Sequence, residues 1–154
     1  MGDVKDNFEE AIKTLNLSAD IVNRLNNEAN QKLYLELLDR FVDGGDRRWW
    51  WEAFKTSFRF PDYDYPAEHL IKIIPDLKKK VWIMIEDDQL PFYPIYEIQT
   101  LYIPLLIDEC FFEFEYYVID KDMEWLICVN HHNYLIGVGH QLQAYNKNII
   151  ISDE

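Results

Sequence analysis

Three histidines and two glutamates in the second half of the chain have types and spacing that could support chemistry. His131 and His132 are adjacent, His140 follows eight residues later, and Glu113 and Glu115 precede them at alternating positions of an expected strand. Zinc takes three or four nitrogen, sulfur or carboxylate ligands, and two carboxylates on one strand face can act as general acid and base. These residues therefore allow a metal-dependent or acid–base hydrolase.

The spacing of the same residues favours a structural role. Adjacent side chains of a strand point to opposite faces, so His131 and His132 could share a metal only if the chain turns there. The gap to His140 fits no ligand motif. Residues 130–133 have the composition of a polar hairpin turn, in which imidazoles bond to backbone or to carboxylates. We therefore expect no metal, no cofactor and no catalytic residue, with the histidines shaping a turn.

The net charge of −13 is unevenly distributed along the 154 residues. Residues 1–80 carry 15 acids and 13 bases, whereas residues 81–154 carry 13 acids and only two bases, Lys121 and Lys147. Nucleic acid is not expected as a direct ligand, because phosphate binding needs a basic surface. The acidic half favours a basic protein partner, although acidic surface also serves solubility alone.

Three consecutive tryptophans, Trp49–Trp51, follow Arg47 and Arg48 in an expected helix that Asp46 caps. Three adjacent side chains span more than half of a helix circumference, so at least one must face away from the core or be covered by another segment. Coverage by the chain itself is the commoner outcome. The alternative is a partner-facing surface, because tryptophan and arginine are enriched in binding hot spots.

Hydrophobic periodicity changes between the two halves of the chain. Apolar spacing predicts helices first and then strands, with one further helix among the strands. The expected helices cover residues 8–15, 18–25, 29–42, 46–58, 66–75 and 103–110, and the expected strands cover 80–86, 92–98, 112–120, 124–130 and 133–139. This order predicts an α+β fold in which N-terminal helices pack on a mostly antiparallel sheet of about five strands. We expect a single domain over residues 1–154, with a helical half (1–78) and a sheet-rich half (79–154).

No apolar run approaches the ~20 residues of a membrane span, and the charged start "MGDVKDNFEE" does not read as a signal peptide. Cys110 and Cys128 lie in apolar, strand-like surroundings, which is typical of buried free thiols in a cytosolic protein, with a disulfide as the alternative. We therefore expect a cytoplasmic protein that does not bind membranes. Its oligomeric state is not predicted.

The combination of "WWWEAF" with "FEYYVIDKDMEWLICVNHHNYLIGVG" resembles a small bacterial family of uncharacterised single-domain proteins. The matching positions are Trp49, Trp50 and Trp51, then Glu115, Tyr116, Tyr117, Trp125, His131, His132 and Gly139. Asn130 stands where that pattern has an acid, which argues against acid–base chemistry at the turn. The layout is also similar to that of SUKH-type domains, α+β proteins of which many are immunity proteins against bacterial toxins.

Charge, tryptophans and resemblance together predict a binding module and not an enzyme. It would hold a basic, toxin-like protein, with acids steering the encounter and buried aromatic contacts slowing dissociation. The residues expected to contact the partner are Trp49, Trp50, Arg47, Glu113, Glu115, Asp87 and Asp88. The metal-dependent or acid–base hydrolase using the His131 and His132 region remains the alternative.

Overall fold

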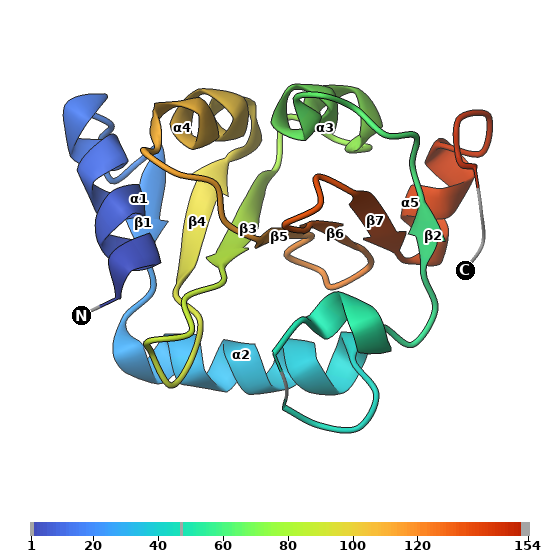
Figure 1. Cartoon of the computed structure of the whole chain (residues 1–154), viewed down its shortest axis with the longest axis horizontal. Coiled ribbons are helices and arrows are strands. Elements are labelled where there is room, and N and C mark those ends of the chain that lie inside the picture. Colours follow the sequence, from blue (N-terminus) through green and yellow to red (C-terminus); the bar gives the residue numbers. More distant parts are fainter. Residues whose placement is uncertain (1, 47, 152–154) are drawn as a thin grey trace.

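The computed structural model describes residues 2–46 and 48–151, which form a seven-stranded antiparallel sheet with helices on both faces (Figure 1). The strand order across the sheet is β1-β4-β3-β5-β6-β7-β2. The strands are β1 (Val22–Arg24), β2 (Phe58–Arg59), β3 (Lys80–Ile85), β4 (Ile95–Gln99), β5 (Tyr116–Ile119), β6 (Leu126–Val129) and β7 (Leu135–Val138). The helices are α1 (Asp3–Thr14), α2 (Asn27–Phe41), α3 (Pro66–Ile73), α4 (Ile103–Glu109) and α5 (His140–Tyr145), with the 3-10 helices η1 (Trp50–Ala53) and η2 (Thr100–Tyr102).

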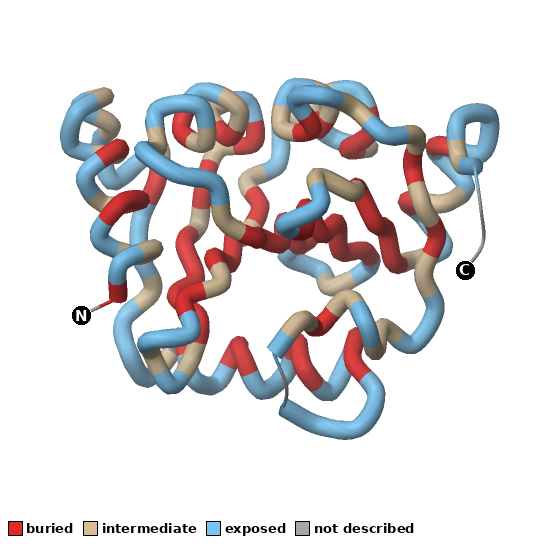
Figure 2. Tube along the Cα trace, viewed as in Figure 1, coloured by how far each residue is buried: buried red, intermediate tan, exposed pale blue. Residues whose placement is uncertain are grey.

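The sheet separates two apolar cores. On one face, α1, α3, α4 and α5 pack through residues such as Phe8, Leu70 and Leu106. On the other face, α2 and η1 pack through Leu37 and Trp50. Figure 2 shows the buried residues concentrated along the central strands and on the inward sides of the helices. Both faces of the sheet are therefore covered, which explains the nearly continuous apolar run of β3.

Helix α2 forms where its sequence predicts a helix. The side chain of Asn26 accepts a hydrogen bond from the backbone N–H of Ala29 at 2.8 Å and caps its first turn. Leu33, Leu37 and Phe41 recur at helical spacing and are buried against the sheet. None of the helices that the structure describes combines the length and apolarity needed to cross a membrane.

The mixed α+β class is confirmed, but the prediction of about five strands is wrong, because the sheet of described residues has seven. The two additional strands are the edges β1 and β2, and both come from residues 1–78. The segment 18–25 was expected to be helical, yet Val22 pairs with Ile98 of β4 and is buried. Pairing with an available sheet edge outweighs the weak helical pattern of so short a segment. The helices are also not segregated at the N-terminus, because α4 and α5 follow most of the strands.

The helix expected over residues 46–58 does not form. Residues 48–58 contain only one 3-10 turn, η1, which starts directly after Trp49, whose backbone is left-handed with a φ of 57°. A left-handed residue cannot continue a right-handed helix. Phe58 lies in the edge strand β2, where it pairs with Gly137 of β7.

Candidate functional site

A row of polar side chains crosses five adjacent strands at one end of the sheet. Continuing the strand register places Tyr93, Glu86, Glu115, Asn130 and Tyr134 opposite one another, just beyond the paired residues of β4, β3, β5, β6 and β7. The backbone N–H of Glu86 donates to the carbonyl of Glu115 at 2.9 Å, and that of Asn130 donates to the carbonyl of Tyr134 at 3.2 Å. Because opposed residues share a sheet face, these side chains lie together on the face that α2 and η1 cover. We call this row the polar rung.

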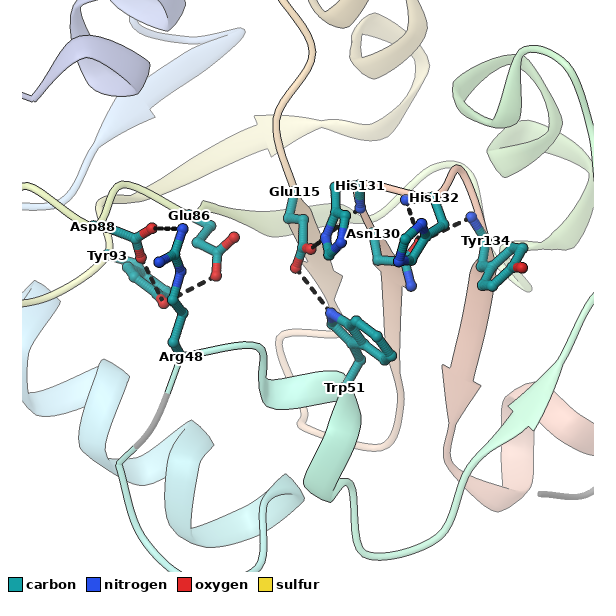
Figure 3. Close-up of polar contacts among 10 residues, drawn as sticks. All are labelled: Arg48, Trp51, Glu86, Asp88, Tyr93, Glu115, Asn130, His131, His132 and Tyr134. Atoms are coloured by element: carbon teal, nitrogen blue, oxygen red, sulfur yellow. Dashed lines mark hydrogen bonds and ion pairs between the residues drawn. The ribbon is translucent and has the colours of Figure 1, made fainter.

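Glu115 ties two other segments to the polar rung. Its side chain is buried, with 3% of the residue exposed. One carboxylate oxygen accepts a hydrogen bond from the indole N–H of Trp51 at 3.1 Å (Figure 3). The other accepts from the backbone N–H of His131 at 3.2 Å and contacts Nδ1 of the same imidazole. Glu115 therefore fixes the orientation of the His131 ring and leaves Nε2 as the ring nitrogen available to a ligand.

Glu86 lies beside Glu115 but has fewer donors. Burial raises the pKa of Glu86 to about 7, and the negative charges of Glu115 and Asp88 add to the shift. The hydroxyl of Tyr93 donates to the Glu86 carboxylate at 3.1 Å and lowers the pKa. A carboxyl group with this pKa is partly protonated at neutral pH, because burial and the neighbouring acids disfavour its charged form.

Asn130 organises the turn that carries the histidine pair. Its Oδ1 accepts hydrogen bonds from the backbone N–H groups of His132 at 2.9 Å and Tyr134 at 3.0 Å. These are the bonds of a polar hairpin turn, as the composition of the segment predicts. The Asn130 residue is only 1% exposed, and its Nδ2 finds no acceptor within residues 2–46 and 48–151.

Two of the three consecutive tryptophans cover the histidine turn. The ring centres of Trp49 and Trp51 lie 5.8 Å and 6.0 Å from that of His131, and His132 lies 4.0 Å from His131. The left-handed backbone of Trp49 and the tight 3-10 turn send the neighbouring rings in different directions, so Trp50 enters the core with no exposed surface. Trp50 is therefore part of the core.

The same loop brings a positive charge to the acidic end of the sheet. The guanidinium of Arg48 forms an ion pair with the carboxylate of Asp88 at 2.7 Å (Figure 3). Its Cζ lies 5.0 Å from the ring centre of Trp49. Both members of the ion pair are largely exposed. Arg48 therefore lies on the surface between Trp49 and the carboxylates that follow β3.

Three of the predicted contact residues are not accessible to a partner. Trp50 and Glu115 are buried as described above, and Asp87 is 1% exposed. Asp87 instead accepts a hydrogen bond from the backbone N–H of Lys5 at 2.9 Å and holds the first turn of α1. A burial pattern of this kind depends on tertiary packing, which the local sequence around these residues does not specify.

Other predicted residues lie away from the polar rung. Glu113 is exposed in the loop that follows α4. His140 begins α5 beyond the opposite end of β7, so the length of a four-residue strand, roughly 13 Å, separates it from the end that carries His131 and His132. The predicted contact at Arg47 lies outside the described residues.

The described residues contain no group of three or more histidine, cysteine or acidic side chains placed to hold a metal ion. Both cysteines are free thiols and not a disulfide. Burial raises the pKa of the Cys110 thiol to about 12 and that of Cys128 well above its ordinary value. Such thiols remain protonated at neutral pH and are poor nucleophiles and ligands.

The sequence did not single out Glu86 or an exposed apolar surface around α4. Glu86 directly follows one strand and Glu115 directly precedes another, so their meeting depends on β3 and β5 being neighbours. The apolar surface consists of Leu101, Leu105, Phe111 and Phe112, and the Phe111 residue is 85% exposed. We call these four residues the α4 surface. The sequence predicted a strand over residues 112–120 and therefore did not indicate this exposed surface. In the structure only Tyr116–Ile119 are in β5.

An open groove of about 530 Å³ is lined by residues of α3, α5 and the segments that flank them. Its lining includes Tyr63, His69, Lys72 and Asn148, and the rings of Tyr63 and His69 stack with centres 3.6 Å apart. None of the predicted site residues lines this groove.

Comparison with known proteins identifies a family for the chain but no similar curated protein or solved structure. No curated protein and no solved structure matches the chain significantly. The resemblance to SUKH-type domains therefore stays a prediction. One family model, described as "Family of unknown function (DUF6756)", matches residues 1–150, which is nearly the whole chain. The chain therefore belongs to the DUF6756 family of unknown function.

Proposed function

We propose that the protein is an acidic protein-binding module that holds a basic protein partner, as an immunity protein holds a toxin domain. The α4 surface carries the proposal, because Leu105, Phe111 and Phe112 expose large apolar side chains next to acidic residues. Exposed apolar surface bordered by polar groups is typical of protein-binding sites. The similarity of the sequence layout to that of SUKH-type domains, many of which are immunity proteins, supports the same function.

The backbone of the α4 surface is held in place before any partner binds. Asn7 of α1 is buried, and its Oδ1 accepts a hydrogen bond from the backbone N–H of Phe111 at 2.7 Å. Its Nδ2 donates to the carbonyl of Phe112 at 3.4 Å. A fixed backbone that presents an exposed aromatic ring loses little conformational entropy on binding, and aromatic side chains are frequent hot spots.

Charge around the α4 surface selects the kind of partner. Asp108, Glu109 and Glu113 are exposed within the same short segment, and residues 81–154 carry 13 acids against two bases. A surface of this sign attracts a basic protein over distances longer than a contact and speeds the encounter. The apolar side chains would then determine how slowly the complex dissociates.

Site-specific photo-crosslinking tests this proposal in cells that produce the protein naturally. A photoreactive phenylalanine analogue replaces Phe111 in one variant and Tyr145, which is exposed on α5, in a control variant. The proposal predicts that one basic protein is crosslinked from position 111 and not from position 145. Crosslinking of the same proteins from both positions, or of acidic proteins only, would contradict it.

A second candidate function is acid–base hydrolysis, and one observation favours it. The buried carboxylate of Glu115 holds Nδ1 of His131, whose side chain is 44% exposed. A carboxylate that orients a histidine in this way supports a general base. Assays of purified protein on chromogenic ester, glycoside and phosphodiester substrates test the candidate: turnover that His131→Ala abolishes would support it, and no turnover on any substrate counts against it.

A further inference from the structure

We infer that Glu86, Asp88 and Trp49 form a recognition site for an arginine side chain of the basic partner, and that Arg48 occupies this site in the free protein. We call these three residues the arginine site. The inference rests on the proposed function only for the kind of partner. The chemistry of the site itself is argued from contacts at the end of the sheet.

A guanidinium group is recognised by an aromatic face together with carboxylate oxygens. Its flat, weakly hydrated surface stacks on indole, and its N–H groups bind carboxylates in a fixed fork. The arginine site offers both elements, because the guanidinium of Arg48 lies between the ring of Trp49 and the carboxylate of Asp88, and the backbone N–H of Trp49 donates to Glu86. Arg48 already uses them, stacking 5.0 Å from Trp49 and pairing with Asp88 at 2.7 Å.

The negative charge of the cluster exceeds the positive charge that Arg48 supplies. Glu86 and Glu115 are directly opposed on neighbouring strands, where Cβ atoms lie about 4.5–5.5 Å apart. The oxygens of Glu115 accept from Trp51 and His131, whereas Glu86 accepts from the Tyr93 hydroxyl and the backbone N–H of Trp49. Burial and, after it, the charges of Glu115 and Asp88 raise the pKa of Glu86. A cation from outside the chain would stabilise the ionised form of Glu86, which burial and the neighbouring acids disfavour.

A second polar group of the same rung is unsatisfied by the chain. The Asn130 residue is 1% exposed, and its Oδ1 faces the amides of the histidine turn, so Nδ2 is directed away from that turn. This donor has no acceptor among the residues that the structure describes. Buried polar atoms without partners are uncommon in folded proteins, and each calls for an explanation. Asn130 lies on the same polar rung as Glu86, two strands away and with Glu115 between them.

The occupation of the site by Arg48 leads to a competition experiment. The probe is the peptide acetyl-Gly-Arg-Gly-amide, titrated into the purified full chain while the indole N–H signals are followed by NMR. We expect saturable shifts of the Trp49 signal. The variant Arg48→Ala should bind the peptide more tightly, by roughly two- to five-fold, because it removes an exposed internal competitor. The variant Glu86→Gln should bind it more weakly than the unchanged chain.

Matched variants separate this effect from a general change of charge. Arg40→Ala removes an equally exposed arginine that pairs with Glu124 at 3.7 Å on another part of the surface. Glu97→Gln removes a carboxylate of β4 that pairs with Lys80 at 3.7 Å. Arg40→Ala should not raise the affinity for the peptide as Arg48→Ala does, and Glu97→Gln should not lower it as Glu86→Gln does. The lysine peptide acetyl-Gly-Lys-Gly-amide should bind more weakly than the arginine peptide, because a lysine ammonium lacks the planar fork.

The pH dependence of peptide binding gives an independent readout. A bound cation stabilises ionised Glu86, so affinity should rise between about pH 6 and pH 8, where that group ionises. The titratable groups that act on Glu86 from the surrounding segments are Glu115, Asp88, Tyr93 and Tyr34, while Arg48 pairs with Asp88 and His131 contacts Glu115. Histidine also gains charge at acid pH, so the contribution of Glu86 is the part of the slope that Glu86→Gln removes.

Three results would overturn the inference. They are the absence of a Trp49 shift in both the unchanged chain and Arg48→Ala, an unchanged or weaker affinity of Arg48→Ala, and an effect of Arg40→Ala equal to that of Arg48→Ala. The proposed function can fail separately. In that case no basic protein is crosslinked from position 111, while the peptide still binds the arginine site.

Discussion

Glu86 and Glu115 face each other across β3 and β5, with the backbone N–H of Glu86 donating to the carbonyl of Glu115 at 2.9 Å. Two carboxylates at such a position repel each other. The chain gives the donors of Trp51 and His131 to Glu115 and leaves Glu86 with a pKa of about 7. This pair is the origin of the site chemistry, because it concentrates negative charge at the end of the sheet next to the tryptophan loop.

The repulsion between the two carboxylates predicts that Glu115→Gln lowers the pKa of Glu86. The substitution removes a charge that raises this pKa, although burial and Asp88 continue to raise it. Carboxyl carbon shifts of glutamate, followed by NMR across a pH titration, measure the change. Glu113→Gln is the control, because Glu113 is exposed in the loop after α4 and should leave the titration unaltered. A Glu86 titration that is the same in Glu115→Gln as in the unchanged chain would contradict the electrostatic account.

The raised pKa of Glu86 also predicts a pH dependence of stability. The folded protein holds this proton more tightly than the unfolded chain, so the free energy of unfolding falls as pH rises from about 4.5 to about 7 and then levels off. Glu86→Gln cannot ionise, so it should gain stability relative to the unchanged chain over that range. The gain should be on the order of 1–2 kcal/mol, after a discount for partial solvent exposure. Urea denaturation at several pH values measures it.

Glu97 is a control, because its pKa is shifted in the opposite direction to that of Glu86. The hydrogen bond from Lys121 lowers the pKa of Glu97. A lowered pKa stabilises the folded state above the ordinary carboxyl range, and this stabilisation is lost as pH falls. Glu97→Gln should therefore destabilise the protein at neutral pH, whereas Glu86→Gln should stabilise it. If both substitutions changed the free energy of unfolding in the same direction at neutral pH, the assignment of opposite pKa shifts to Glu86 and Glu97 would be refuted.

The indole of Trp51 is predicted to stabilise the fold through its N–H group. Trp51→Phe keeps an aromatic ring but leaves one oxygen of the buried Glu115 carboxylate without its donor at 3.1 Å. The free energy of unfolding should fall by about 1–3 kcal/mol, which is the cost of leaving a buried polar group without its hydrogen bond. Chemical denaturation measures it, and Trp82→Phe on β3 is the control for replacing a half-buried tryptophan. A Trp51→Phe protein as stable as Trp82→Phe would show that the hydrogen bond contributes little.

Asp87 is predicted to act on stability and not on binding. Asp87→Ala removes the carboxylate that accepts from the backbone N–H of Lys5 in the first turn of α1. The expected cost is about 0.5–2 kcal/mol, as for loss of a helix cap. Asp88→Ala should instead weaken the binding of the arginine peptide with a smaller loss of stability, because Asp88 is exposed and pairs with Arg48. Thermal unfolding and peptide titration of both variants separate the two roles, and a reversal of their effects would contradict this assignment.

The elements with strong periodicity were predictable from the sequence. Helix α2 and strand β3 formed close to their expected positions. An apolar stripe at helical spacing indicates a helix buried on one face, and a continuous apolar run indicates a strand buried on both faces. The turn at His131 and His132 was predictable from its polar composition. The edge strands β1 and β2 were not, because segments of three and two residues owe their conformation to the neighbouring strand.

The candidate site was predictable only in part. Trp49, Asp88 and the histidines were expected to matter, but their convergence with Glu86 depends on which strands are neighbours in the sheet. The directions of the three tryptophan rings depend on the left-handed backbone of Trp49, which no sequence rule anticipates for a bulky residue. The prediction of a helix there failed for this reason, and with it the expectation that Trp50 contacts a partner.

The most direct test of acid-steered binding uses the kinetics of the partner that crosslinks from position 111. Association and dissociation are measured by stopped flow for the unchanged chain, Phe111→Ala and Tyr145→Ala. Association should slow markedly between about 0.01 M and 1 M salt, as the Debye length falls from ~30 Å to ~3 Å. Phe111→Ala should dissociate roughly tenfold faster or more with little change in association, whereas Tyr145→Ala should behave as the unchanged chain. Association that is insensitive to salt, together with unchanged dissociation of Phe111→Ala, would contradict the account.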